Sequence, residues 1–289
     1  MGCIWMIFIS FVFLDACTQS IWGSKIPSPI YGVTIDNTRS LNAIVKSLAM
    51  LPRKASARIV FDPGVSANHY LPAVREIKKV SYVMGEILDS ESMGVLSVAD
   101  YLKRTREYLS CLKGQVDLWE IGNEVNGEWL GKSSEVILKI SGAYDFVKNQ
   151  GESSALTLFY NENCWEKPEN RMFDWARRNL PDRVKKGVDC VFISHYEDQC
   201  KGPRPDWTRV FKRLGEIFPN SKLGFGEVGT SSQKNKENLV NHYYRLKIRH
   251  PRFVGGYFWW YFTRDMVPHE RKLWKTLHQA MLGELPRLD

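Results

Sequence analysis

The sequence predicts a single (β/α)8 barrel, and three observations lead to this fold class. Segments typical of buried strands alternate with segments typical of helices, and eight strand segments can be recognised. The length of 289 residues is close to that of one such barrel. The composition, 44% hydrophobic and 25% charged, is that of an ordinary globular domain, and no low-complexity linker marks off a second one.

The first half of the chain supplies four predicted strands and two predicted helices. Each strand is an apolar, β-branched or aromatic run that is followed by glycine, proline or polar residues. The strands span residues 30–36, 57–62, 80–88 and the beginning of 116–129. One helix is predicted over 40–51. A second begins at Ser97, where Asp100 three residues later gives a start like a capping box.

The second half continues the alternation with four more strands. These are predicted over residues 155–160, 190–194, 222–230 and 253–262. The predicted helices span residues 136–147, 171–179, 207–218, 237–248 and 271–281. In a (β/α)8 barrel the carboxyl ends of all eight strands meet at one mouth, and that mouth holds the active site. Polar residues at the strand ends are therefore the first candidates for function.

Two of the strand ends deliver a glutamate in a similar sequence setting. The stretch 116–129 (VDLWEIGNEVNGEW) begins as a strand and breaks at Gly122, so that Glu124 follows directly from a rigid element. The stretch 222–230 (KLGFGEVGT) is built in the same way and delivers Glu227. A glutamate at the end of a buried strand is costly to desolvate unless it has a function. Two such glutamates at one mouth form the carboxylate pair that glycoside cleavage requires.

Further polar and aromatic residues are expected at the same mouth. We take them as candidates for contacts with a substrate: Arg58, Asn123, His195, Tyr196, Trp259 and Trp260. Each also has a simpler interpretation. Arg58 would pair with Glu86 or Asp62 inside the barrel, and His195 would be a hydrogen-bonded framework residue. Glu86 and Glu162 also end strands, and they would border the cleft without a catalytic role.

This pattern resembles the clan A retaining glycoside hydrolases, whose barrels place a glutamate after strand four and another after strand seven. Members of family 5 or family 39 are the ones it is most similar to. The resemblance implies that Glu124 is the general acid/base and Glu227 the nucleophile. It also implies that Asn123 binds the sugar 2-hydroxyl and that Arg58 keeps the nucleophile ionised.

On strand six the family places a histidine and a tyrosine one residue apart, whereas His195 and Tyr196 are adjacent here. Which of the two points inward stays open. The resemblance further implies that an aromatic side chain from Trp259, Trp260 or Tyr261 floors the sugar site. It implies no cofactor.

Other classes of function suit the residues less well. A sugar-binding barrel without turnover would keep the cleft and its aromatic residues, but it would not need the two carboxylates. A metal-dependent hydrolase would need clusters of histidine and aspartate at the strand ends, and the six histidines do not form such a set, so no metal site is expected. The expected partner is a polysaccharide or oligosaccharide substrate of unspecified sugar and linkage.

The net charge of +8 and the pI of about 9.1 would suit an acidic glycan, an anionic membrane or nucleic acid. The basic residues are dispersed, however, and no nucleic-acid-binding motif is present, so no nucleic acid partner is expected. A monomer is the expected oligomeric state.

The N-terminus reads as an export leader over residues 1–22, followed by a catalytic domain over 23–289. Residues 4–14 form an uncharged apolar run that is short for a membrane span and typical of a signal peptide. The residues that end in Cys17 resemble a lipoprotein box, which would attach the chain to a membrane through a lipidated cysteine. We therefore expect an extracytoplasmic protein, either secreted, periplasmic or lipid-anchored.

Four cysteines follow the leader. Cys164 and Cys200 come after neighbouring strands on one face of the barrel, and they could form a disulfide if their Cα atoms lie within about 7 Å. The alternative is four ordinary buried thiols, the other two being Cys111 and Cys190. No cysteine spacing suggests zinc.

Overall fold

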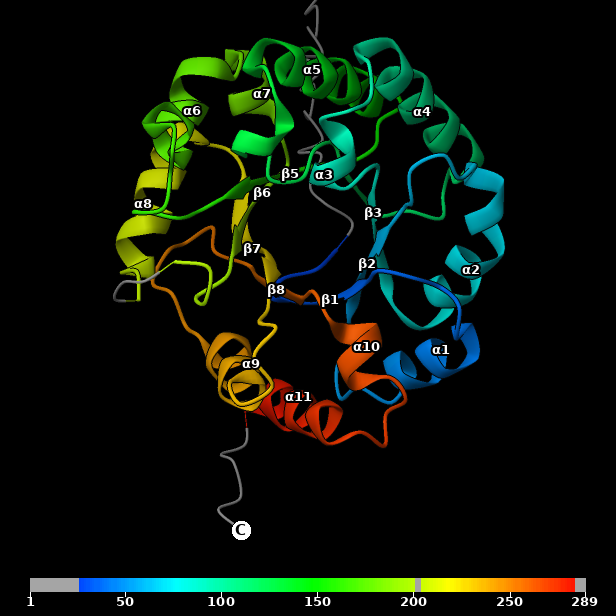
Figure 1. The fold of residues 1–289 in the computed structure, drawn as a ribbon. Helices are drawn as coiled ribbons and strands as arrows, with labels where there is room; N and C mark the ends of the chain where they lie inside the picture. The colour runs from blue at the N-terminus through cyan, green and yellow to red at the C-terminus, as the bar shows by residue number, and fades with distance from the viewer. Residues whose placement is uncertain (1–25, 201–203, 284–289) are drawn as a thin grey trace, which may run out of the picture.

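The computed structural model describes residues 26–200 and 204–283, which form a closed barrel of eight parallel strands. The strands follow one another around the barrel in chain order, and β1 closes onto β8 (Figure 1). They are β1 (Ile30–Ile35), β2 (Ser56–Val60), β3 (Tyr82–Glu86), β4 (Leu118–Glu120), β5 (Ser154–Phe159), β6 (Cys190–His195), β7 (Lys222–Val228) and β8 (Gly255–Trp259). The predicted fold class, a single (β/α)8 barrel, is confirmed.

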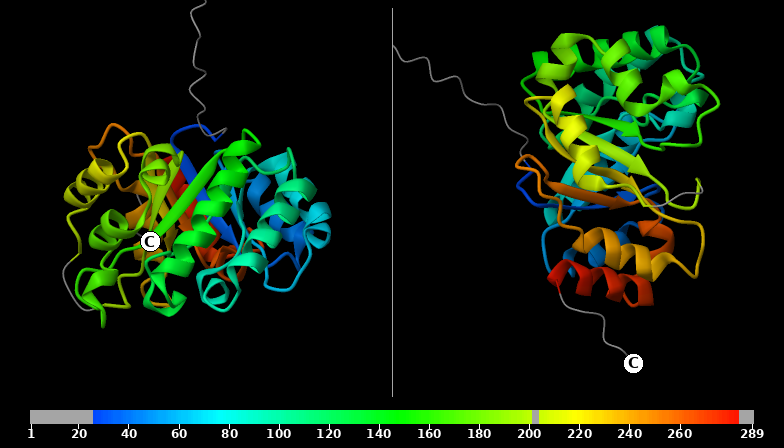
Figure 2. Two further views of the ribbon diagram at one scale, coloured as in Figure 1. Left: turned by 90° about the horizontal axis from the view of Figure 1, so that it is seen from above. Right: turned by 90° about the vertical axis from the view of Figure 1, so that its left-hand side faces the viewer.

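Helices surround the barrel on all sides, as the end-on view and the two side views show (Figures 1 and 2). The α-helices are α1 (Leu41–Ala49), α2 (Ala67–Val80), α3 (Ser90–Met93), α4 (Val98–Cys111), α5 (Ser133–Asn149), α6 (Met172–Asn179), α7 (Asp182–Gly187), α8 (Trp207–Ile217), α9 (Lys236–Arg245), α10 (Phe262–Met266) and α11 (Lys272–Leu282). Two short 3-10 turns, η1 (Glu128–Leu130) and η2 (Pro168–Asn170), lie in the loops after β4 and β5.

The sequence predicted the start of α4 but missed α2. Ser97 caps α4 as expected, because its hydroxyl accepts a hydrogen bond of 3.1 Å from the Asp100 backbone amide. No helix was predicted between the second and third strands. Pro72 lies inside α2 and obscures the helical pattern. The signal that was available is the spacing of the residues on the buried face: Ala67, Tyr70, Ala73, Val74 and Ile77.

The last strand is shorter than predicted. The expected strand over 253–262 ends at Trp259, and Phe262 is already the first residue of α10. The whole run is apolar and aromatic, and such a run does not reveal where a buried strand gives way to a buried helix. Trp260 therefore lies in the connection between β8 and α10 rather than within the strand.

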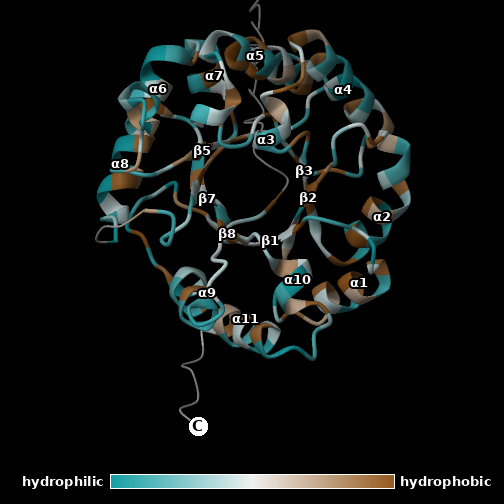
Figure 3. Cartoon of the chain, viewed as in Figure 1, coloured by the Kyte–Doolittle hydropathy of each residue, from teal (hydrophilic) through white to brown (hydrophobic). Residues whose placement is uncertain are grey.

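The inside of the barrel has a polar upper part, at the carboxyl ends of the strands, and an apolar lower part, farther from those ends. Met84, Leu118, Phe192 and Phe258 pack together as members of a small buried cluster separate from the main core. The main core lies between the strands and the helices, and most helices carry both hydrophilic and hydrophobic stretches (Figure 3). The polar upper part of the interior faces the mouth, where the strands end.

The export and anchoring predictions fall outside the described residues. The predicted leader, residues 1–22, and Cys17 belong to the stretch 1–25, and the boundary at residue 23 stays a prediction for the same reason. Within 26–200 and 204–283, no helix is both long enough and apolar enough to cross a bilayer.

Candidate active site

The two predicted glutamates line the same cleft at the carboxyl ends of the strands. Glu124 comes four residues after the end of β4, and Glu227 is the last residue but one of β7. The cleft has a volume of about 690 Å³, and both side chains border it although they are almost fully buried. The volume is within the range of small-molecule binding sites. The structure therefore brings together the pair that the sequence singled out.

Glu227 is held by a cation and a hydroxyl. Arg58 on β2 contacts one carboxylate oxygen through Nη1 at 3.0 Å, and Tyr196 after β6 donates its hydroxyl to the other at 2.5 Å. Both donors favour the ionised carboxylate. Gly226 is an extra residue of β7 opposite Ile193 and Ser194, and it shifts the register of β7 against β6 just before Glu227.

Glu124 is held by two serines and contacts no cation among the described residues. Ser194 donates its hydroxyl to one carboxylate oxygen at 2.5 Å, and Ser90 donates to the other at 2.9 Å. Ser90 in turn accepts a hydrogen bond of 3.1 Å from the indole of Trp129, whose side chain is half exposed at the cleft. The backbone of Glu124 has a φ of 47°, a left-handed conformation that is uncommon for a residue other than glycine and is typical of functional sites.

Arg58 does not reach the cleft, so its assignment as a substrate contact is wrong. It is fully buried and forms two hydrogen bonds with Glu120, at 2.7 and 3.3 Å, besides the one with Glu227. A third carboxylate, Glu86, lies 3.1 Å from Nη2. Thr157 donates its hydroxyl to Glu120 and completes the cluster. Arg58 thus holds the Glu227 carboxylate in place and lies beside its charge.

The cluster around Arg58 contains more carboxylates than cations. Glu86 and Glu120 lie side by side in the register of β3 and β4, and both are fully buried. Burial raises the pKa of Glu86 well above the usual range, and the guanidinium only partly offsets this. With a proton on Glu86, two ionised carboxylates, those of Glu120 and Glu227, would remain beside the single guanidinium of Arg58. The predicted pairing of Arg58 with Glu86 is thus present, whereas pairing with Asp62 is not.

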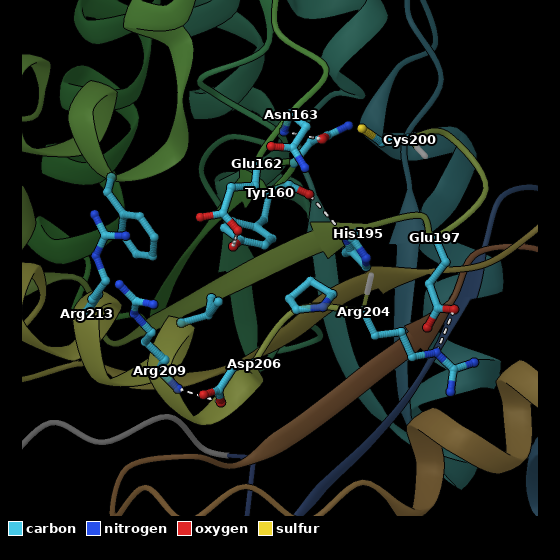
Figure 4. A pocket seen from close by; sticks show the side chains of 14 residues that line it. Tyr160, Glu162, Asn163, His195, Glu197, Cys200, Arg204, Asp206, Arg209 and Arg213 are labelled. Carbon is cyan, nitrogen blue, oxygen red and sulfur yellow. Dashed lines mark hydrogen bonds and ion pairs between the residues drawn. The ribbon is translucent and has the colours of Figure 1, made fainter. Parts of the chain in front are cut away.

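The adjacent residues His195 and Tyr196 point in different directions. Tyr196 lines the cleft, which answers the question that the sequence left open. His195 lines a separate pocket outside the strands, and its Nδ1 lies 2.9 Å from the carbonyl oxygen of Tyr160 (Figure 4). Assigning His195 to the substrate cleft is therefore a mistake, and its cause is the alternation of side chains along β6.

Of the aromatic candidates, too, one lines the cleft and the other does not. Trp260 lines the cleft together with Tyr261, whereas Trp259 is fully buried and its indole donates to Asp265 at 3.3 Å. Trp259 is thus a packing residue and does not contact the cleft. The Arg58 guanidinium lies 5.5 Å from the centre of the Trp260 ring, so this side chain covers the cluster beneath it.

Asn123 borders the cleft and carries an unpaired polar atom. It is almost fully buried, and its Oδ1 has no hydrogen-bond partner among the described residues. A buried amide oxygen without a partner is uncommon in folded proteins, so it calls for an explanation. A hydroxyl group of a ligand in the cleft would supply the missing donor.

Burial raises the pKa of both carboxyl groups in the cleft. For Glu124, desolvation raises the pKa to about 7, and its two serine partners oppose the shift. For Glu227, desolvation and the nearby Glu124 carboxylate raise the pKa to about 8, although its arginine and tyrosine partners oppose the rise. Because each negative charge disfavours the other, the pair keeps a proton near neutral pH. Of the two, Glu227 is the one that contacts a guanidinium. The arginine and the tyrosine favour the charge on Glu227, and a proton on Glu124 removes the repulsion that raises the pKa of Glu227.

Sequence reasoning missed four polar residues of the site: Ser90, Glu120, Thr157 and Ser194. Ser194 was within reach, because it shares a face of β6 with Tyr196. Glu120 was within reach for the same reason, because it shares a face of β4 with Leu118, whose side chain lies inside the barrel. No local signal marks Ser90, since its contact with Glu124 joins two separate loops. Within the described ranges, no group of three or more metal-ligating side chains is placed to hold a metal ion.

The likeness to known proteins lies in the fold. No protein-family model and no curated protein matches the sequence. The solved structure of Saccharomyces cerevisiae Gas2p in complex with laminaritriose and laminaritetraose is 14% identical with a TM-score of 0.57, and the match covers 89% of this chain and 65% of that chain. The complex of Gas2p with laminaripentaose gives the same four values. A third structure, ScGas2 in complex with compound 8, is 16% identical with the same TM-score and coverage.

This chain therefore spans 65% of the length of those Gas2p chains. Identities of 14–16% establish similarity of structure and leave the activity to be argued from the site. The chain is a (β/α)8 barrel of the same fold as the Gas2p barrel.

Proposed function

We propose that the protein is a retaining O-glycosyl hydrolase that cleaves β-glycosidic bonds by double displacement. The observation that carries this proposal is the unequal environment of two carboxyl groups in one cleft. Glu227 has a guanidinium and a phenol as partners, as suits a nucleophile that must be ionised. The Glu124 carboxylate accepts hydrogen bonds from two serine hydroxyls and forms no ion pair among the described residues, as suits an acid that must begin protonated. The resemblance to clan A supports the same two roles.

The first step transfers the sugar to the enzyme. A carboxylate oxygen of Glu227 attacks the anomeric carbon while the bond from that carbon to the leaving oxygen breaks. Glu124 gives its proton to the leaving oxygen, so the leaving group departs as an alcohol. The negative charge of Glu227 is consumed in the new ester bond. Tyr196 and Arg58 hold the attacking carboxylate in place throughout.

The second step returns the enzyme to its starting state. Glu124, now ionised, removes a proton from water, and the resulting hydroxide oxygen bonds to the anomeric carbon as the ester bond breaks. Two inversions at the same carbon leave the product with the starting β configuration. Asn123 supports both steps, since its unpaired Oδ1 would accept a hydrogen bond from a sugar hydroxyl.

Laminari-oligosaccharides are the first substrates to test, because Gas2p structures of the same fold hold them. The aromatic side chains of Trp129, Trp260 and Tyr261 at the cleft suit the faces of pyranose rings. The disulfide between Cys164 and Cys200, with Cα atoms 5.9 Å apart, supports an oxidising location outside the cytoplasm. The predicted export leader supports it as well.

The proposal is tested by following the products of oligosaccharide cleavage. We would incubate the protein with laminaripentaose and with β-1,4-linked glucan, mannan and xylan oligosaccharides, and record the first anomer by NMR. The expected result is cleavage of at least one of them with the β anomer appearing first. An α anomer appearing first would contradict the retaining mechanism. Binding without any product would favour the alternative, a carbohydrate-binding barrel without turnover.

Replacing Tyr196 with phenylalanine is expected to lower kcat by roughly 10- to 100-fold. The change removes a hydrogen bond to a charged group, which is worth about 1.5–3 kcal/mol, and about 1.4 kcal/mol corresponds to a tenfold change in rate. Initial rates on an oligosaccharide substrate measure the effect, and Tyr31→Phe, on the amino-terminal part of β1, is the matched control. Unchanged kcat in Tyr196→Phe would contradict the role of this hydroxyl.

The pH profile of kcat/KM is expected to be bell-shaped. Activity falls as pH rises through the pKa of Glu124, about 7, because the acid loses its proton. Activity falls in acid because Glu227 becomes protonated. Ser194→Ala removes a hydroxyl that lowers the pKa of Glu124, so the alkaline limb should move to higher pH. An alkaline limb that stays in place, or moves to lower pH, would show that Glu124 is not the group that titrates.

A further inference from the structure

A second pocket lies beside the cleft and has no place in the proposed mechanism. It is lined by residues of the loop between β5 and α6, by described residues of the loop between β6 and α8, and by α8 itself (Figure 4). Its volume is about 290 Å³, enough for a monosaccharide unit. Two pairs of adjacent residues separate the two sites. Phe159 and Tyr196 line the cleft, whereas their neighbours Tyr160 and His195 line this pocket.

Two guanidinium groups in this pocket lack anionic partners in the described part of the chain. Arg209 and Arg213 are four residues apart on α8, so their side chains lie on one face of the helix. Neither guanidinium has a hydrogen bond or ion pair with another residue within 26–200 and 204–283. The Arg213 guanidinium lies 4.0 Å from the centre of the Phe173 ring, which fixes its position.

Three carboxylates also line the pocket, and each has a partner within it. Glu197 pairs with Arg204 at 2.9 Å. Asp206 accepts a hydrogen bond of 3.1 Å from the Arg209 backbone amide and so caps α8. Glu162 accepts a hydrogen bond of 3.2 Å from Tyr160. In Figure 4 the guanidiniums of the two α8 arginines and Glu162 lie on one side of the cavity, and the Arg204–Glu197 pair lies on the other.

The floor of the pocket adds a hydrogen-bond acceptor. His195 Nδ1 lies 2.9 Å from the carbonyl oxygen of Tyr160, so Nδ1 must carry the proton and Nε2 is left with a lone pair. Burial lowers the pKa of His195, which keeps the ring neutral. The disulfide between Cys164 and Cys200 links the loop after β5 to the loop after β6 at the edge of the pocket.

We propose that this pocket binds a sugar unit that carries a carboxylate, a hexuronate. The carboxylate would lie between Arg209 and Arg213, since guanidinium groups match carboxylate geometry with paired hydrogen bonds. The hydroxyl groups of the sugar would donate to Glu162 and to His195 Nε2. Such a site goes beyond the proposed hydrolase activity, because it needs neither of the two catalytic glutamates.

Binding of free glucuronate tests the proposal. Isothermal titration with glucuronate, glucose and inorganic phosphate would compare the wild-type protein with the double variant Arg209→Gln/Arg213→Gln. Lys212→Gln is the matched control, because it removes an exposed cation of the same helix that does not line the pocket. We expect glucuronate to bind the wild type, to bind the double variant at least tenfold more weakly, and to bind Lys212→Gln within twofold of the wild type.

Other outcomes would overturn the proposal. Equal affinity for glucose would show that the carboxylate is not recognised, and equal affinity for phosphate would indicate an anion site without sugar recognition. Weaker glucuronate binding in Trp260→Ala would place the ligand in the cleft. Thermal unfolding of the double variant shows whether its fold is intact. If the double variant is unfolded, the single variant Arg209→Gln, which replaces an exposed side chain, is measured instead. It should also bind glucuronate at least tenfold more weakly than the wild type. Cleavage of laminaripentaose is measured in a separate assay, so that failure of the glucuronate proposal does not bear on the proposed hydrolase activity.

Discussion

Replacing Glu227 with alanine abolishes turnover on every substrate, if Glu227 is the nucleophile. Without its carboxylate no glycosyl-enzyme ester can form, and no other described side chain occupies its position against Arg58 and Tyr196. The expected loss is at least roughly 10⁴-fold, the order of effect seen when a covalent nucleophile is removed. Initial rates on an oligosaccharide and on an activated aryl glycoside measure it. The loss should be as large on the second substrate as on the first.

A matched control separates this effect from a general loss of structure. Glu76→Ala removes a glutamate on the exposed surface of α2, where it pairs with Lys79, and should leave turnover unchanged. Glu227→Ala removes one carboxylate from a buried cluster that has more carboxylates than cations, so the fold should tolerate it. Residual activity within tenfold of the wild type, in a folded protein, would remove Glu227 from the mechanism.

The sequence is most informative where one local pattern determines the outcome. Strand endings can be read from short apolar runs followed by glycine, and this pattern alone places Glu124 and Glu227 at one mouth. Asn123 follows from its position next to a strand end, whereas Tyr196 follows only as one of two adjacent candidates, the other being His195. The barrel itself follows from repetition, which tolerates errors in single elements such as the missed helix α2.

The partners of the glutamates are harder to predict, because they come from distant parts of the chain. Ser90 and Glu124 are 34 residues apart, and Arg58 and Glu227 are 169 apart. Side-chain direction at the end of a strand also depends on small shifts in register. A register shift between β6 and β7 and a strand end at Trp259 accompany the outcome that Tyr196 and Trp260 border the cleft, whereas His195 and Trp259 do not. Neither feature has a signature in the residue types alone.

Replacing Glu124 with alanine should give a different phenotype from the loss of the nucleophile. The change removes the proton donor, so natural glycosides with poor leaving groups should lose roughly 10²–10⁴ in rate, the usual size of general acid–base catalysis. An activated aryl glycoside needs little protonation of its leaving group. Its first step should survive in Glu124→Ala, and the covalent intermediate on Glu227 should accumulate because no base activates water. A burst of aryl alcohol followed by slow turnover would reveal this.

Azide distinguishes the two glutamates, because it attacks the anomeric carbon without a general base. In Glu124→Ala it should react with the accumulated glycosyl-enzyme, restore turnover of the aryl glycoside and give the β-glycosyl azide. In Glu227→Ala any rescue should give the α-glycosyl azide, since azide would then displace the aryl group directly. NMR of the two products reads the configuration. A β-azide from Glu227→Ala, or an α-azide from Glu124→Ala, would reverse the assigned roles, because the carboxylate left in each variant determines the face that azide attacks.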